Sequence, residues 1–295
     1  MHSRFKKIYI RVPANATAGG VEALFQLVDA INNISDNCYI LYDDPSVTTV
    51  VPKYQRYNSK ITSIVEDVNE NLIIYPELWT NHIHEFRNIQ KSIWWLSVDN
   101  DQGRFKEFFN ENIQHFYQSY YAMEHLIKNG ANRYIPIFEY ISERHLTHSY
   151  TIEQKQNIVC FNPFKGLQIT NIIISQNPHI KFVPLINMDE SQVIETLKSS
   201  KVYIDFGNHP GRDRIPREAA HLGNCVITNT SGSAFYFNDV PILSKYKVKT
   251  VEEASFMINH CLQFYEENAQ NFSLYRTIIK NQRDEMINQV NQFFT

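Results

Sequence analysis

The sequence lacks the features of several large classes of protein. No segment approaches the ~20 apolar residues that cross a bilayer, and the N-terminal residues contain no long apolar run typical of secretory signals. A basic excess is also absent, because the formal net charge is −3. Domains that follow phosphate backbones usually carry such an excess. We therefore predict a cytoplasmic protein that has no nucleic-acid partner, and leave open peripheral contact with the inner face of a membrane.

Cysteine is scarce and has no metal-binding spacing. The four cysteines are Cys38, Cys160, Cys225 and Cys261, and no two of them form a CxxC pair. We expect free, mostly buried thiols in a reducing compartment, and the spacing disfavours a zinc site. Aspartates with DxD spacing occur at Asp99-Asn100-Asp101 alone. We predict no bound metal.

Internal repeats, heptads, low-complexity tracts and a GxGxxG fingerprint are absent as well. Strand-like apolar runs instead alternate with segments of helical periodicity, which predicts an α/β protein with two parallel sheets. The expected strands are 7–12, 38–42, 71–75, 92–98, 114–118 and 134–138, then 157–161, 180–184, 201–204 and 224–228. A polar linker is expected at His145–Gln156, between domains at 1–150 and 151–270, followed by a C-terminal helix at 271–295.

The segment richest in ionisable groups is Lys201–Ala220, KVYIDFGNHPGRDRIPREAA. It begins as a strand and ends as a helix that opens near Arg217. The loop between them carries three arginines, a histidine and two carboxylates. Loops of this kind, which follow a strand and lead into a helix N-terminus, bind anions in α/β proteins. We predict an anionic ligand here.

Most ionisable residues of this segment have a functional and a structural interpretation. Arg212, Arg214 and Arg217 stay charged and can fork onto phosphate oxygens. Glu218 could accept a hydrogen bond from a ribose or sugar hydroxyl, or could cap the helix alone. His209 could donate to a phosphate or transfer a proton, or could be a loop histidine without such a role. We take His209 and Arg214 as catalytic candidates, and the three arginines and Glu218 as ligand-binding candidates.

Further candidates lie at the ends of other expected strands. Lys165 could neutralise a diphosphate, or could be an exposed loop lysine. Gly19 and Gly20 would let the backbone approach a ligand, or form a tight turn. Ser233 could help to cradle phosphate through backbone N–H groups, or could lie in a plain turn. Asp99 could act as a general base or bind a sugar hydroxyl, and completes the catalytic candidates.

The second half of the sequence resembles a known family. Residues 216–227, with Pro216, Glu218, Ala219, Gly223 and Val226-Ile227, resemble the donor-site segment P-x-E-A-x-x-x-G-x-P-V-I of retaining GT-B glycosyltransferases. IDFGNHPGRDRIPREAA together with IIYPELW and SIWWLSVDN is similar to bacterial glycosyltransferases of surface-polysaccharide gene clusters. The resemblance spans nearly the whole chain. It implies two Rossmann-like domains that face a cleft, with the C-terminal helix packing back on the N-terminal domain.

The resemblance also implies roles for residues. Glu218 would contact the ribose of the donor, while Lys165 and an arginine of the loop would neutralise its diphosphate. The turn at Gly19-Gly20 would approach the same diphosphate. The sequence departs from the family at Pro210, because the first glutamate of the family's double-glutamate motif stands eight positions before the second. This departure leaves the catalytic assignment and the retaining outcome open.

The resemblance implies a metal-independent, retaining-type glycosyltransferase of bacterial surface-polysaccharide synthesis. Its N-terminal domain would bind a glycan or lipid-linked acceptor, and its C-terminal domain a nucleotide-diphosphate sugar, with no cofactor beyond this co-substrate. Homo- and hetero-oligomers are both left open. Two alternatives stand beside this prediction: a nucleotide-sugar epimerase of similar shape, and a non-catalytic nucleotide- or sugar-binding subunit, which the missing glutamate keeps open.

Overall fold

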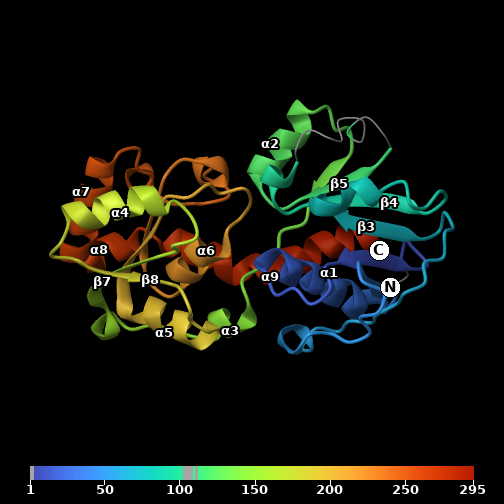
Figure 1. The fold of residues 1–295 in the computed structure, drawn as a ribbon, viewed down its shortest axis with the longest axis horizontal. Helices are drawn as coiled ribbons and strands as arrows, with labels where there is room; N and C mark the ends of the chain where they lie inside the picture. Colours follow the sequence, from blue (N-terminus) through green and yellow to red (C-terminus); the bar gives the residue numbers. More distant parts are fainter. Residues whose placement is uncertain (1–2, 102–108, 110–111) are drawn as a thin grey trace. The chain divides into compact units, whose positions relative to one another are not determined.

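The computed structural model describes residues 3–101, 109 and 112–295. It contains two compact units, one formed by Met1–Tyr140 with Gln282–Thr295 and the other by Ile141–Asn281. Each unit is a parallel sheet with helices against its faces (Figure 1). The predicted fold class, two Rossmann-like domains, is confirmed.

Unit 1 is built on a six-stranded sheet in the order β2-β1-β3-β4-β5-β6. Its strands are β1 (Ile8–Val12), β2 (Cys38–Tyr42), β3 (Leu72–Pro76), β4 (Gln90–Trp95), β5 (Gln114–Tyr117) and β6 (Tyr134–Pro136). Its helices are α1 (Gly19–Ser35) and α2 (Tyr120–Lys128), with 3₁₀ turns at η1 (Pro52–Tyr54), η2 (Glu77–His82) and η3 (Val98–Asn100). All pairings are parallel, so the strand ends that carry candidate residues share one edge of the sheet.

Successive side chains of each strand point to opposite faces of this sheet, and different helices cover the two faces. Ile8 and Ile10 of β1 pack into the same core as α1, whereas Tyr9 belongs to the core that contains Leu126 of α2. The long helix α9 (Ser273–Phe294) contributes its second half to the α1 side (Figure 1). The prediction that the C-terminal helix packs on the N-terminal domain is confirmed.

Unit 2 is built on a four-stranded sheet in the order β10-β9-β7-β8. Its strands are β7 (Gln156–Phe161), β8 (Lys181–Pro184), β9 (Ser200–Asp205) and β10 (Cys225–Thr228). Its helices are α3 (Glu143–Leu146), α4 (Leu167–Gln176), α5 (Glu190–Ser199), α6 (Arg214–His221), α7 (Val251–Gln263), α8 (Tyr265–Gln270) and the first part of α9, with 3₁₀ turns at η5 (Ile152–Gln154), η6 (Gly232–Phe235) and η7 (Ser244–Tyr246). Helix α4 contacts α7, and α5 contacts α6, as in a sheet covered on both faces.

The segment expected to be a linker, His145–Gln156, is part of unit 2. Ile141 is buried in the core of this unit, and Leu146 of α3 packs against that core. The prediction of a linker is therefore wrong, because Leu146 within the segment and Ile141 just before it attach this part of the chain to the core of unit 2. The structural limits at residues 140–141 and 281–282 also differ from the predicted limits at 150–151 and 270–271.

Two expectations from composition can be compared with the structure. Cys38, Cys160, Cys225 and Cys261 are free and buried, as expected. Among the described residues, no helix combines the length and apolar composition needed to span a membrane.

The packing of α9 gives a test of the division into units. We expect Met286→Ala to destabilise unit 1 by about 2–5 kcal/mol, because it deletes a fully buried side chain and leaves a cavity. Chemical denaturation followed by tryptophan fluorescence measures this effect, since Trp79, Trp94 and Trp95 all lie in unit 1. Gln292→Ala, at an exposed position of the same helix, should leave the transition unchanged. An unchanged fluorescence transition in Met286→Ala would contradict the assignment of this helix to unit 1.

Candidate active site

The loop that follows β9 in unit 2 is held by close backbone contacts. Ser233 fixes it from the side of η6: its amide donates to His209 O at 2.8 Å and its hydroxyl to Gly211 O at 2.6 Å. Gly232 has φ of 57°, and a Cβ there would lie 2.1 Å from His209 O. Gly166 has φ of 62° and would bring a Cβ within 2.4 Å of the Phe206 carbonyl carbon. Only glycine permits these two approaches.

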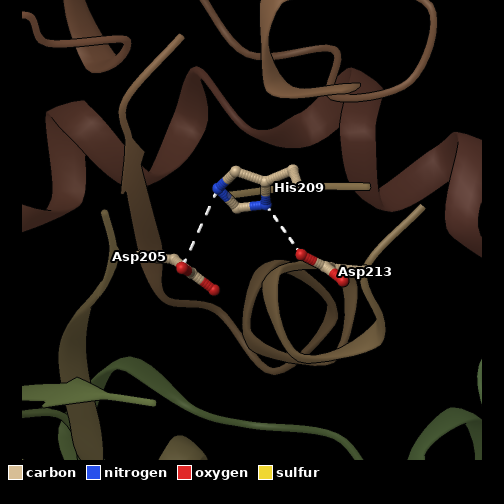
Figure 2. Close-up of side chains that lie close together, drawn as sticks. All are labelled: Asp205, His209 and Asp213. Atoms are coloured by element: carbon tan, nitrogen blue, oxygen red, sulfur yellow. Dashed lines mark hydrogen bonds and ion pairs between the residues drawn. The ribbon is translucent and has the colours of Figure 1, made fainter. Parts of the chain in front are cut away.

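Asp205, His209 and Asp213 form a chain of charged groups inside this loop (Figure 2). His209 Nδ1 lies 2.8 Å from Asp213 Oδ2, and His209 Nε2 lies 3.8 Å from Asp205 Oδ1. Lys165 donates to both oxygens of Asp213, at 2.7 and 2.8 Å. The carboxylate of Asp213 therefore pairs with two cationic side chains, which come from different loops of unit 2 and hold this loop in place.

Burial and charge set the protonation of this chain in opposite directions. Burial raises the pKa of Asp205 above its ordinary value. Burial alone would lower the pKa of His209, but the hydrogen bond that it donates to Asp213 and the charges of Asp205 and Asp213 outweigh burial and raise it. Burial likewise opposes ionisation of Asp213, yet the bonds to His209 and Lys165 hold its pKa below the ordinary value. The favoured state is an imidazolium beside an ionised Asp213.

The same three residues have ligand atoms within 4.8 Å of one another, a spacing at which a metal ion could be held. The charges of these residues and of Lys165 argue against a metal ion here. Two carboxylates already face an imidazolium and the ammonium of Lys165, and a divalent cation would have to displace Lys165 from both oxygens of Asp213. A protonated imidazole is also no metal ligand. The protein's own cationic side chains, Lys165 and His209, thus neutralise the carboxylates of this cluster.

The three arginines differ in their accessibility. Arg217 is buried in α6, and its guanidinium donates to the carbonyl oxygens of Asp213 and Arg212 at 3.2 and 2.8 Å. Arg212 is buried as well, whereas Arg214, the first residue of α6, is partly exposed. The geometry of Arg217 is that of a clamp on the loop backbone. Of the three side chains, that of Arg214 is the most open to a ligand.

Glu218 lies at the fifth position of α6, beyond the first turn, which contains no acidic residue. The alternative that it only caps the helix is therefore wrong. The carboxylate is buried, and its Oε2 lies 3.5 Å from Nε2 of His145 in α3. Sequence reasoning missed His145, because it lies in the segment interpreted as a linker.

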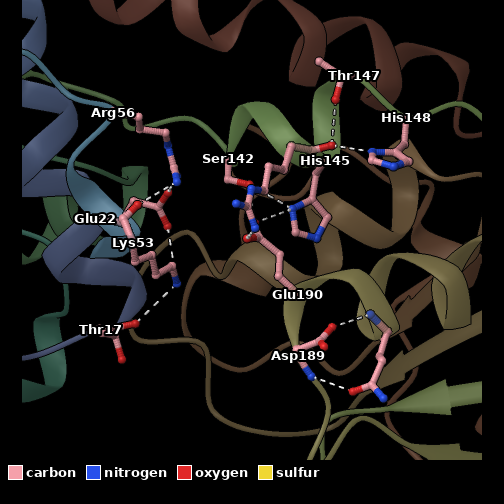
Figure 3. A network of polar contacts seen from close by, with 12 residues as sticks. Thr17, Glu22, Lys53, Arg56, Ser142, His145, Thr147, His148, Asp189 and Glu190 are labelled. Atoms are coloured by element: carbon pink, nitrogen blue, oxygen red, sulfur yellow. Dashed lines mark hydrogen bonds and ion pairs between the residues drawn. The ribbon is translucent and has the colours of Figure 1, made fainter. Parts of the chain in front are cut away.

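In unit 1, Gly19 and Gly20 are exposed and open helix α1. A Cβ on Gly20 would be 3.7 Å from Leu96 Cδ1, which is ordinary contact, so packing does not demand a glycine there. Glu22 in the first turn is buried and pairs with the guanidinium of Arg56 (Figure 3). Sequence analysis did not single out this pair, whose members are 34 positions apart.

Asp99 lies exposed in η3, after β4. The neighbouring Glu77 is buried, and accepts from the amide of Leu96 at 3.0 Å and from Asn100 Nδ2 at 2.7 Å. Burial raises the pKa of Glu77 to about 7. Asp101 lies 2.6 Å from His125 Nε2, so the Asp99-Asn100-Asp101 triplet directs its residues to different partners.

Comparisons with known proteins agree on the fold. No protein-family model and no curated protein matches the sequence. The chain is similar to the crystal structure of HepE from Anabaena in complex with UDP-glucose, with a TM-score of 0.68, 12% identity and 99% of each chain covered. It is similar to a glycosyltransferase from Rickettsia africae, with a TM-score of 0.69, 14% identity, and 98% of this chain and 96% of that chain covered.

A further similar structure is that of a mutant of S. aureus TarM in complex with fondaparinux, α-GlcNAc-glycerol and UDP. Its TM-score is 0.62 at 11% identity, and the match covers 78% of this chain and 56% of that chain. At such identities the similarity establishes the fold. The GT-B type of fold predicted from the donor-site segment is confirmed.

The protonation of His209 gives a prediction for stability. Because its pKa is raised in the folded state, its stabilising contribution is complete below the unfolded value of 6.5 and is lost as the pH rises through the folded value. We expect His209→Gln to lower the free energy of unfolding by about 1.5–3 kcal/mol near pH 6, with a smaller loss at alkaline pH. Chemical denaturation of the wild-type protein and of His209→Gln at a series of pH values between about 5.5 and 9.5 measures the difference in their free energies of unfolding. A loss that grows with pH would contradict the imidazolium.

Proposed function

We propose that this protein is a glycosyltransferase that moves a sugar from a nucleotide-diphosphate sugar to a glycan or lipid-linked acceptor. One observation carries the proposal: at the carboxyl edge of the sheet of unit 2, Lys165 donates to Asp213, the residue before Arg214, and Glu218 lies about one turn further along the same helix. Ligands of such sheets bind at this edge. HepE, which has a similar fold, is described in complex with UDP-glucose.

The cationic groups suit a departing diphosphate. The side chain of Lys165 is 31% exposed, so a ligand can reach its ammonium without unfolding the loop. Arg214 stands at the first position of α6, where the helix N-terminus adds partial positive charge. Together they would stabilise negative charge that develops on the leaving group, a role that a metal ion fills in other enzymes.

A diphosphate would compete with Asp213 for Lys165. Asp213 would then keep its contact with His209, so the loop would retain one of its two ion pairs while the ligand is bound. His209 therefore fits a role in holding the loop better than proton transfer to a sugar, because it is buried between carboxylates. Asp99 stays the candidate for proton transfer or sugar contact in unit 1, the unit proposed to bind the acceptor.

The finer assignments are part of the same proposal. Residues similar to those of surface-polysaccharide transferases support a role in bacterial surface-polysaccharide synthesis at the cytoplasmic side of the membrane. Metal independence is supported by the cations that unit 2 supplies. The segment around Glu218 supports the retaining outcome. Because Pro210 stands where the family has its first glutamate, residues other than that glutamate would carry out the retaining reaction.

Donor hydrolysis tests the proposal. We expect slow release of nucleoside diphosphate from one member of a panel of UDP-, ADP-, GDP- and dTDP-sugars, undiminished by a chelator of divalent cations. Arg214→Ala and Lys165→Ala should each slow the release by about 10–100-fold, because each removes a charged hydrogen-bond donor to the diphosphate.

Lys181→Ala is the matched control, since Lys181 is an exposed lysine of β8, the strand that pairs with β7 in the sheet of unit 2. It should hydrolyse the donor at the wild-type rate. Tight binding of a nucleotide sugar without any release would instead indicate the non-catalytic binding subunit. The proposal fails if no nucleotide sugar binds at all.

A further inference from the structure

His145 connects Glu218 to a second carboxylate in unit 2. Its Nδ1 lies 3.1 Å from the hydroxyl oxygen of Ser142, and that hydroxyl donates to Glu190 Oε1 at 2.7 Å (Figure 3). Its Nε2 is buried, makes no hydrogen bond, and lies 3.5 Å from Glu218 Oε2. The imidazole is thus placed between two carboxylates from α5 and α6.

The positions of the protons follow from this geometry. A serine hydroxyl has one hydrogen, and that of Ser142 is directed to Glu190. The Ser142 oxygen must then accept from His145 Nδ1, so Nδ1 carries a hydrogen. A neutral imidazole with this tautomer would present the lone pair of Nε2 to the carboxylate of Glu218. The charged imidazolium presents an N–H instead, which is the favourable arrangement.

This imidazolium faces both carboxylates, because its Nδ1 also lies 3.6 Å from Glu190 Oε1. Glu190 receives a second cation, since Arg144 Nη1 lies 3.2 Å from its Oε2. Within the described residues, the cationic partner of Glu218 is His145. Both side chains of the pair are buried, with side-chain exposures of 4% for His145 and 9% for Glu218. Such a partner offsets the cost of burying a carboxylate.

We propose that His145 is a positioning residue for the donor site: it holds the Glu218 carboxylate in the orientation in which it accepts hydrogen bonds from the ribose hydroxyls. This inference rests on the proposed function, in which Glu218 contacts the ribose. An ionised carboxylate has two acceptor oxygens, whereas a protonated one would present a donor to one hydroxyl. The pair therefore serves recognition of the ribose and leaves the diphosphate to Lys165 and Arg214.

Binding measurements on the wild-type protein and its variants test the proposal through the ribose hydroxyls. Isothermal titration calorimetry compares UDP, ADP, GDP and CDP, each with its 2′,3′-dideoxy analogue. We expect the wild-type protein to bind its preferred ribonucleotide about 10–100-fold more tightly than the analogue, because the analogue lacks the hydroxyls that donate to Glu218. His145→Phe, which keeps an aromatic ring but has no N–H, should reduce this ratio to about 1–3-fold, chiefly by weakening the ribonucleotide.

Conservative and control variants distinguish positioning from loss of structure. His145→Gln places an amide N–H near the position of Nε2 and should restore most of the ratio. Glu195→Ala changes an exposed residue of α5 outside this network and should leave the ratio near the wild-type value. Retained binding of the dideoxy analogue by His145→Phe shows that unit 2 is folded. Its thermal unfolding provides a second check.

The outcomes separate this inference from the proposed function. If Glu218→Ala abolishes the ratio but His145→Phe leaves it unchanged, His145 does not position Glu218. If Glu218→Ala also leaves it unchanged, Glu218 does not contact the ribose, and the inference is overturned with that assignment. If no nucleoside diphosphate binds to the wild-type protein, the proposed function itself is overturned.

Discussion

The carboxylate of Asp213 is partly buried beside Lys165 and His209, and the loop after β9 depends on the pairing of its negative charge with these two cations. Lys165 comes from the loop after β7, and His209 from the loop after β9, so the carboxylate joins two neighbouring strand ends. Its own backbone carbonyl receives Arg217. With Asp213 fixed in this way, the helix that follows begins at a defined place, and Arg214 and Glu218 are carried into position with it.

One partly buried and one buried carboxylate show how the partners of a carboxylate decide whether it ionises. Asp213 faces a lysine and a histidine, and its pKa lies below the ordinary value despite burial. Glu77 in unit 1 accepts from a backbone amide and from the neutral side chain of Asn100, and burial raises its pKa to about 7. Neutral donors offset less of the cost of burying a charge than cations do. Near neutral pH, Glu77 can therefore change its protonation state while Asp213 stays ionised.

The sequence predicted the elements of both sheets and the loop that carries the candidate residues, because apolar periodicity and the strand–loop–helix pattern are local signals. It did not predict the partners within that loop. Lys165 and Asp213 are 48 positions apart, and nothing in either segment specifies which cation meets which carboxylate. His145 was missed for a related reason: α3 has four residues, too few to show a period, and its attachment to unit 2 depends on isolated apolar contacts. All three arginines were ligand-binding candidates in the sequence, and only the packing of Arg217 excludes it from that role and leaves Arg214.

The return of α9 to unit 1 has a consequence for the order in which the chain can fold. Residues that close the core of unit 1, among them Val290 and Phe294, are synthesised after all of unit 2. Unit 2 is continuous in sequence and is complete before them. Domains usually fold from the N-terminus during synthesis. Here unit 2 can finish folding first, while one face of the sheet of unit 1 still lacks the part of its apolar cover that α9 supplies beside α1. Unit 1 is therefore the one more exposed to association with other chains during synthesis.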